Sequence, residues 1–150
     1  MSSTAGPVDP RDAPTVRTAR GGQRSTMVWQ VLSALALLAM GGIHLYLALT
    51  STGGVLGDLF VLNAVGGFVL AIAVVVLHGR LLAVATVLGL LFLGGTLLAL
   101  VLALTVGLFG LRSSLDYELA PTTLVVESIG TLVLLVTTLL VLSRPKGRHR

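Results

Sequence analysis

Four long runs of apolar residues divide the chain, and each is separated from the next by a short polar or glycine-containing break. The runs cover about residues 27–49, 59–78, 81–111 and 122–143. A membrane-spanning helix needs about 20 mainly apolar residues, and every run reaches about that length. The pattern therefore predicts an all-α fold, a bundle of four transmembrane helices. The third run is longer than a bilayer requires, so we expect that helix to tilt or to extend beyond the membrane.

The segments outside these runs are polar. Residues 1–26 contain Pro7, Pro10 and Pro14 and show no apolar periodicity. Such a segment buries too little apolar surface to offset the entropy lost on ordering, which predicts a disordered cytoplasmic tail. Residues 144–150 are predicted to form a basic cytoplasmic tail. The first run exceeds a signal-peptide core in length and is followed by no small-residue cleavage site, which favours an uncleaved membrane anchor.

The composition supports the same class. Of the 150 residues, 55% are hydrophobic and only 11% are charged, whereas about a quarter of the residues in soluble domains are charged. The chain has no cysteine, which excludes disulfides, thiolate metal sites and cysteine nucleophiles. The sequence is therefore that of an integral membrane protein.

The positive charges indicate the orientation. Four of the ten basic residues precede the first run and four follow the last: Arg11, Arg17, Arg20, Arg24, Arg144, Lys146, Arg148 and Arg150. Short cytoplasmic segments of membrane proteins are enriched in Lys and Arg. With four spans, both tails and the break at Arg80 lie on one side, so we predict a multi-pass plasma membrane protein with both termini in the cytoplasm.

The distribution of positive charge also indicates which partners the protein can bind. Binding to nucleic acid needs a basic groove interleaved with aromatic residues, and the sequence has none. The predicted partner is the lipid bilayer, and the basic tail after residue 143 can also bind anionic lipid. A membrane protein partner and a homo-oligomer both remain open.

Three polar residues inside the apolar runs form a predicted layer near the outer surface. They are His44 in the first run, Asn63 in the second and Glu127 in the fourth. Counted from the outer ends of their runs at 1.5 Å per residue, all three lie about 6 to 9 Å deep. We expect the three side chains to point toward one another.

Each polar residue has a glycine about one turn deeper on the same helix face. Gly41 precedes His44 by three residues, Gly67 follows Asn63 by four, and Gly130 follows Glu127 by three. Residues three or four apart share a helix face, and small residues in membrane helices permit close backbone approach. Gly41, Gly67 and Gly130 are therefore predicted to be helix-packing positions.

The layer has two interpretations. The first is structural, with interhelical hydrogen bonds that fix the helix register. The second is functional, with His44, Asn63 and Glu127 as ligand-binding or proton-exchanging residues, because ionisable groups within a membrane are functional candidates. An ionised carboxylate at the centre of a span costs about 2.5 to 3.5 kcal/mol, so Glu127 should be protonated or paired, and His44 is the cationic partner at its depth.

No sequence motif fixes a reaction. The chain lacks a Walker A loop, a G-x-S-x-G turn, an H-E-x-x-H pair and a dinucleotide fingerprint. The polar layer offers too few and too mixed ligands for a metal site, so neither metal nor cofactor is predicted. A haem would need His44 from two chains or another axial ligand. His78 lies about 20 Å from Asn63 along the axis, and we interpret it as an interfacial residue at a helix end.

The first two apolar runs each contain a short sequence motif. Gly41-x-x-His44-Leu45-x-Leu47 is followed by Leu59-Phe60-x-Leu62-Asn63, and this pair of motifs resembles uncharacterised small four-helix integral membrane proteins of actinobacteria. The resemblance implies a four-span protein without an assigned activity. It also implies that His44, Phe60 and Asn63 are motif positions.

Three hypotheses for the function follow. The first is a small, non-enzymatic integral membrane protein that serves as an accessory component. The alternative is a carrier or sensor in which His44 and Glu127 bind a proton or small ligand. The second alternative is a haem or quinone redox subunit.

Overall fold

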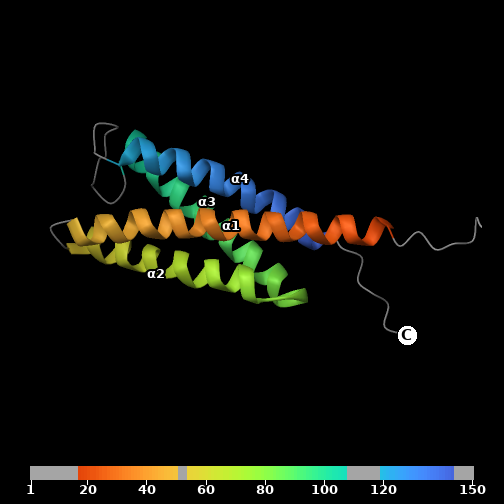
Figure 1. Ribbon diagram of the computed structural model, residues 1–150. Helices are drawn as coiled ribbons and strands as arrows, with labels where there is room; N and C mark the ends of the chain where they lie inside the picture. Colours follow the sequence, from red (N-terminus) through yellow and green to blue (C-terminus); the bar gives the residue numbers. More distant parts are fainter. Residues whose placement is uncertain (1–16, 51–53, 108–118, 144–150) are drawn as a thin grey trace, which may run out of the picture.

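The computed structural model describes residues 17–50, 54–107 and 119–143, with side chains from residue 25 onward. Within these ranges the protein is all-α and contains four helices (Figure 1). They are α1 (Arg17–Thr50), α2 (Gly54–Val76), α3 (Gly79–Thr105) and α4 (Ala120–Leu142). The predicted all-α bundle of four long helices is thus confirmed.

The helices run up and down in chain order, so the bundle has two distinct ends (Figure 1). At one end α1 turns into α2, and the C-terminus of α3 lies near the N-terminus of α4. We call this the loop end, and the opposite end, where α2 joins α3, the tail end. Helix α1 packs most extensively against α2 and also against α4, while α3 packs mainly against α4. Helix α1 is therefore central to the bundle.

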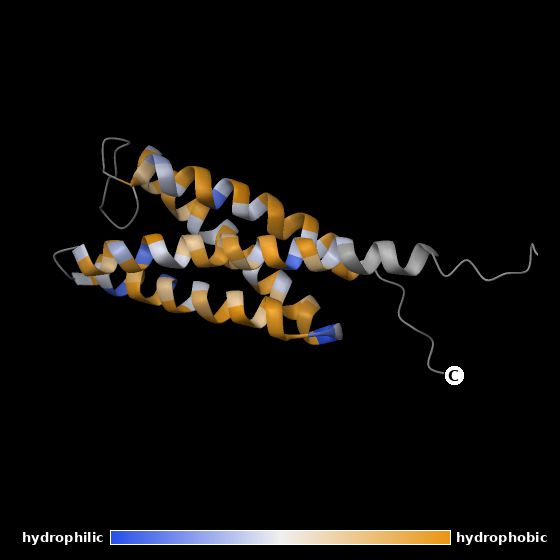
Figure 2. Ribbon diagram, viewed as in Figure 1, coloured by the Kyte–Doolittle hydropathy of each residue, from blue (hydrophilic) through white to orange (hydrophobic). Residues whose placement is uncertain are grey.

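All four helices are long and apolar enough to cross a membrane, judged by length and composition. Hydrophobic residues make up most of each helix (Figure 2), and many of their leucine and valine side chains are exposed, with Leu49 77%, Val55 73% and Leu91 67% exposed. Large apolar side chains over so much of the surface would be unfavourable in water, since apolar area is driven out of contact with it. The outward face of the bundle is therefore suited to lipid, as expected of a multi-pass membrane protein.

Helix α1 begins ten residues before the predicted start of the first span. Residues 17–26, which the composition assigned to a disordered tail, are helical. Extension of an existing helix costs far less than nucleation of a new one, and no proline follows Pro14 in this stretch to stop it. Residues 1–16 and the basic tail at 144–150 lie outside the described residues.

The other helix ends also differ from the apolar runs, and glycines account for the largest differences. Helix α2 begins at Gly54, five residues before the predicted start at residue 59. Helix α3 ends at Thr105, not at residue 111, because Gly107 has a φ of 88°. The N–H of Gly107 donates to the carbonyl of Leu102 at 2.9 Å, a capping bond that ends the helix. Hydropathy does not report these backbone reversals.

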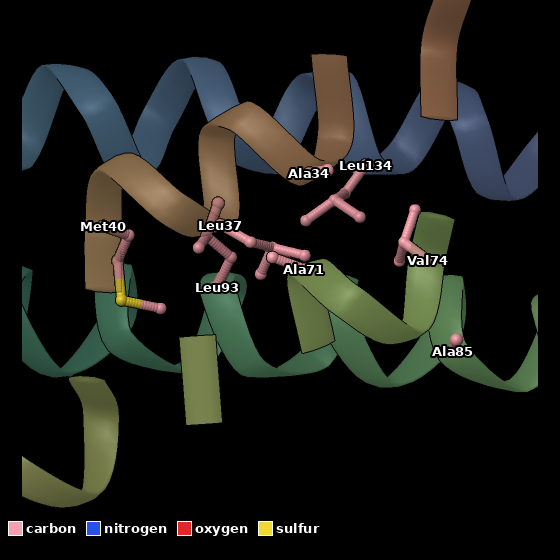
Figure 3. Packing of buried hydrophobic residues seen from close by; sticks show 8 residues of the cluster. All are labelled: Ala34, Leu37, Met40, Ala71, Val74, Ala85, Leu93 and Leu134. Carbon is pink, nitrogen blue, oxygen red and sulfur yellow. The ribbon is translucent and has the colours of Figure 1, made fainter. Parts of the chain in front are cut away.

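The core lies between the four helices, and each of them contributes side chains to it (Figure 3). Its fully buried side chains include Leu37 and Met40 of α1, Leu93 of α3 and Leu134 of α4. These side chains belong to one apolar cluster. The cluster separates the polar groups near the loop end from those near the tail end.

A hydrogen-bonded hydroxyl pair joins α1 to α4 near the tail end. Ser33 Oγ and Thr137 Oγ1 are 2.7 Å apart, and both residues are fully buried. Thr137 has one hydroxyl hydrogen, and its shortest contact to a carbonyl is with Val133 at 2.8 Å. Ser33 therefore donates to Thr137. Nothing in the sequence pattern marks these two hydroxyl residues as partners.

Removing the Thr137 hydroxyl is expected to weaken this contact only modestly. Thr137→Val should lower the free energy of unfolding by about 0.6 kcal/mol and by no more than about 2 kcal/mol, the range for interhelical hydrogen bonds in membranes. Titration with sodium dodecyl sulfate in mixed micelles measures the change. Thr122→Val, at an exposed position of the same helix, is the control. Equal losses in the two variants would contradict a specific contribution from the Ser33–Thr137 pair.

Candidate functional site

Close contact between α1 and α2 positions the first residue of the candidate site. A Cβ atom added to Gly67 would lie 3.0 Å from the carbonyl oxygen of Leu37 and 3.1 Å from the Cα of Gly41. A Cβ atom on Gly41 would lie 3.3 Å from the carbonyl oxygen of Ala64. The two backbones therefore touch at this level, and the next turn of α1 places His44 against α2.

His44 is buried between the helices, with 5% of its surface exposed. Its Nδ1 atom lies 3.0 Å from the carbonyl oxygen of Met40, one turn back in α1. Its ring meets Phe60 of α2 in an edge-on arrangement, with the ring centroids 5.8 Å apart. The hydrogen bond and the ring contact hold the imidazole in one orientation and leave Nε2 free to face another helix.

That other helix is α4, which supplies Glu127. Glu127 is 1% exposed, and its Oε1 atom lies 4.0 Å from His44 Nε2. Three residues further along α4, a Cβ atom on Gly130 would overlap Leu93 and would lie 3.1 Å from the Cβ of Ala36. Glycine at this position lets α4 approach both α1 and α3, which brings the carboxyl group to the imidazole.

The hydrogen bond to Met40 determines which ring nitrogen of a neutral His44 carries the hydrogen. The other nitrogen, without a hydrogen, faces Glu127. A carbonyl oxygen only accepts hydrogen bonds, so Nδ1 carries a hydrogen. In a neutral imidazole Nε2 then holds a lone pair, and Nε2 is the atom that faces Oε1. One proton can reside on Glu127, giving two neutral groups, or on Nε2, giving an ion pair. Both arrangements have zero net charge.

The energetics favour the two neutral groups. A buried ion loses several kcal/mol of hydration even after the protein relaxes. Two unit charges 4 Å apart attract each other by about 4 kcal/mol at an effective dielectric constant of 20, which is less than the loss for two ions. The separation also exceeds a direct hydrogen bond by about 1 Å, so a small side-chain rotation is enough to let the carboxylic acid donate to Nε2.

The second carboxyl oxygen of Glu127 has no such partner. Among the described residues, no group forms a hydrogen bond with Oε2, and the same holds for Thr131 Oγ1, one turn along α4. The hydroxyl of Thr96 in α3 interacts with the Glu127 carboxyl group while it donates its own hydrogen to the carbonyl of Leu93 at 2.9 Å. Thr96 and Thr131 thus extend the site beyond the residues identified from sequence. Thr131 could have been found from the sequence, because it lies four residues after Glu127 and so on the same helix face.

Asn63 does not join the pair. The contact of His44 with Phe60 and that of Gly41 with Ala64 set the register between α1 and α2, and they place Asn63 level with Gly41, one turn deeper than His44. Asn63 is half-buried, and no hydrogen bond connects it to another residue in the described part of the chain. The structure thus brings His44 and Glu127 together and shows no contact of Asn63 with either of them, because the register of α2 on α1 places Asn63 one turn deeper.

The remaining candidates lie elsewhere. His78 is exposed at the tail end, where it precedes the first residue of α3. Within the described ranges there is no cluster of three or more His, Asp or Glu residues that could hold a metal ion. Buried ionisable chemistry in the described spans is therefore concentrated at His44 and Glu127.

The fold and the site define a class, that of a multi-pass membrane protein with a buried acid–base pair between two of its spans. Comparisons with protein-family models, with curated proteins and with solved structures gave no match to this chain. The resemblance to actinobacterial four-helix proteins stays a prediction.

Proposed function

We propose that the His44–Glu127 pair binds and releases a proton, and that the protein is a proton-linked carrier or sensor. The observation that carries the proposal is the 4.0 Å approach of Nε2 to Oε1 between two buried side chains from α1 and α4. The pair has one lone-pair nitrogen and one carboxyl group facing each other, which is the donor and acceptor set needed to hold a proton.

A comparison with the hydroxyl pair near the tail end supports function over a purely structural role. Ser33 and Thr137 lie at direct hydrogen-bonding distance, 2.7 Å, as expected of groups that fix helix register. The His44–Glu127 separation is longer, and Oε2 has no hydrogen-bond partner among the described groups. A site that exchanges a proton needs such incomplete pairing, because the proton must have a route in and out.

The setting of this site follows from the charge distribution. With Lys and Arg concentrated at the two chain ends, we propose that the protein spans the plasma membrane with the tail end in the cytoplasm. The loop end, nearer to His44 and Glu127, then faces outward. The basic segment after residue 143 is positioned by sequence to bind anionic lipid. An accessory role beside another membrane protein is compatible with proton sensing.

Infrared spectroscopy of the protein in lipid nanodiscs tests the proposal. At neutral pH the wild-type protein is expected to show the carbonyl stretch of a protonated carboxylic acid in an apolar environment, and Glu127→Gln should remove it. Raising the pH should diminish the band as the proton is released. His44→Gln should shift the band, because the acid loses the acceptor that faces it.

Asp58→Asn is the matched control, since Asp58 is an exposed carboxylate of α2. This variant should retain the carboxylic acid band with unchanged position and pH response. A wild-type spectrum indistinguishable from that of Glu127→Gln at every pH would contradict the proposal.

A further inference from the structure

Helix α4 carries three buried side-chain polar atoms that lack hydrogen-bond partners among the described residues. They are Glu127 Oε2, Thr131 Oγ1 and Thr138 Oγ1. The spacings of four and seven residues place all three within about 40° of one another around the helix axis at 100° per residue. The three atoms therefore form one line along the inward face of α4, which we call the α4 polar line.

This line differs from the other hydroxyl groups of the bundle. The hydroxyls of Thr86, Thr96 and Thr123 donate to carbonyl oxygens three or four residues earlier in the chain, at 3.1, 2.9 and 2.8 Å. Such internal bonds satisfy a hydroxyl in an apolar environment without any partner helix. Thr131 and Thr138 make no bond of this kind. Buried polar groups are rarely left unpaired, and ordered water commonly satisfies them.

An apolar constriction interrupts the α4 polar line. Leu134 lies between Thr131 and Thr138, is fully buried, and belongs to the same apolar cluster as Leu37 and Leu93 (Figure 3). The Leu134 side chain also packs over Gly89, where an added Cβ atom would be 3.2 Å away. The seven residues from Thr131 to Thr138 correspond to about 10 Å along the axis, a distance that no single hydrogen bond spans.

Polar groups continue on the tail side of the constriction. Thr138 follows Thr137, which bonds to Ser33 and also approaches the carbonyl oxygen of Trp29 at 3.2 Å. One turn further toward the tail end, Gln30 Nε2 donates to the carbonyl oxygen of Val74 at 3.3 Å. The interior of the bundle thus contains polar groups on both the loop-end side and the tail-end side of the apolar layer.

We propose that the α4 polar line is a proton path through the membrane, with a loop-end half at Glu127 and Thr131, a tail-end half at Thr138, and a closure at Leu134. The path rests on the proposed proton binding by the His44–Glu127 pair. A proton on the Glu127 carboxyl group transfers to a water molecule held by Thr131, which leaves a carboxylate and a hydronium ion. The carboxylate then takes a proton from a hydronium ion that arrives from the loop end, which restores the acid and leaves a neutral water molecule. Displacement of Leu134 connects the hydronium ion to water at Thr138.

The absence of cysteine from the natural sequence permits a direct test of water access. Thr131→Cys and Thr138→Cys are placed singly in oriented proteoliposomes, and silver ions are added on one side as a small probe that reaches hydrated thiols. Thiols left free are then alkylated in detergent and counted by mass spectrometry. Thr131→Cys should be protected from alkylation by silver at the loop end, and Thr138→Cys by silver at the tail end.

Leu132→Cys and Leu139→Cys are the matched controls, because these α4 residues face outward with 63% and 58% exposure. Both controls should stay free of silver added on either side. Equal reaction of the four variants, or no reaction of Thr131→Cys and Thr138→Cys from any side, would overturn the path. If the Glu127 carboxylic acid band is present in the infrared spectrum in that case, proton binding stands and only the path fails.

Opening the constriction supplies an independent measurement. Leu134→Ala should raise the proton permeability of proteoliposomes severalfold, as followed with an enclosed pH-sensitive dye, and addition of Glu127→Gln should abolish the increase. Leu93→Ala widens the same layer from α3 and serves if Leu134→Ala does not fold. A leak that persists in the presence of Glu127→Gln would show passage through lipid defects and would overturn the proposal.

Discussion

Gly67→Leu is expected to lower the free energy of unfolding by about 3 kcal/mol, in the upper part of the range for overpacked cores. An added Cβ atom at this position meets backbone atoms, the carbonyl oxygen of Leu37 at 3.0 Å and the Cα of Gly41 at 3.1 Å. Backbone atoms cannot rotate out of the way as the end of a side chain can. The larger residue therefore fits only if α1 and α2 move apart.

The control for this variant is Gly42→Leu. Gly42 is next to Gly41 in the same helix but is exposed, and a Cβ atom there would meet nothing within 4 Å. Both changes replace a helical glycine with leucine, so helix propensity cancels in the comparison. Unfolding in mixed micelles should show a large loss for Gly67→Leu and none for Gly42→Leu. Similar stabilities of the two variants would mean that close contact at Gly67 does not hold the helices together.

His44→Leu is expected to destabilise the protein by about 1 to 3 kcal/mol, the cost of leaving a buried polar group without its partner. Glu127 is 1% exposed, so its carboxyl group stays inside the bundle when the imidazole is removed. The loss should grow as the pH is raised, because an ionised, unpaired carboxylate in the interior costs more than a neutral acid.

The double variant His44→Leu/Glu127→Leu distinguishes a coupled pair from two independent residues. Once both polar groups are replaced by apolar side chains, neither position leaves a buried polar group without its partner, and stability should return close to that of the wild type. The double variant should also lose the pH dependence shown by His44→Leu. Simple addition of the two single losses would contradict direct coupling between His44 and Glu127.

The four helices could be predicted because run length and low charge are strong signals in a membrane sequence. Their ends could not, since these depend on single backbone angles. Gly107 ends α3 with a φ of 88°, yet its neighbours Val106 and Leu108 are as apolar as the span itself. In α2, the apolar run begins only after the charged Asp58, although a charged residue near the end of a helix can reach the polar interface.

The His44–Glu127 pair could be anticipated from depth, because both residues lie a similar distance from the loop end. The place of Asn63 outside this pair is a matter of register between helices. Depth counted along one helix does not give the register between two helices. Here the contact between Gly41 and Gly67 determines the register of α1 and α2. The Ser33–Thr137 pair escaped prediction for a related reason, since lone hydroxyl residues are common in membrane helices and only the packing of α1 on α4 makes these two partners.

The α4 polar line also bears on how the protein enters the membrane. Helices α1 and α3 satisfy several of their own polar groups internally, as His44 does with Met40 and Thr96 with Leu93. These groups therefore keep their hydrogen bonds when the helix resides in lipid before the bundle forms. Helix α4 carries all three of the described buried polar atoms without partners. Its release into lipid alone would therefore cost more free energy than the release of α1 or α3. Because α4 is made after the other three, it leaves the insertion machinery when α1 and α3 are already available to cover its polar face.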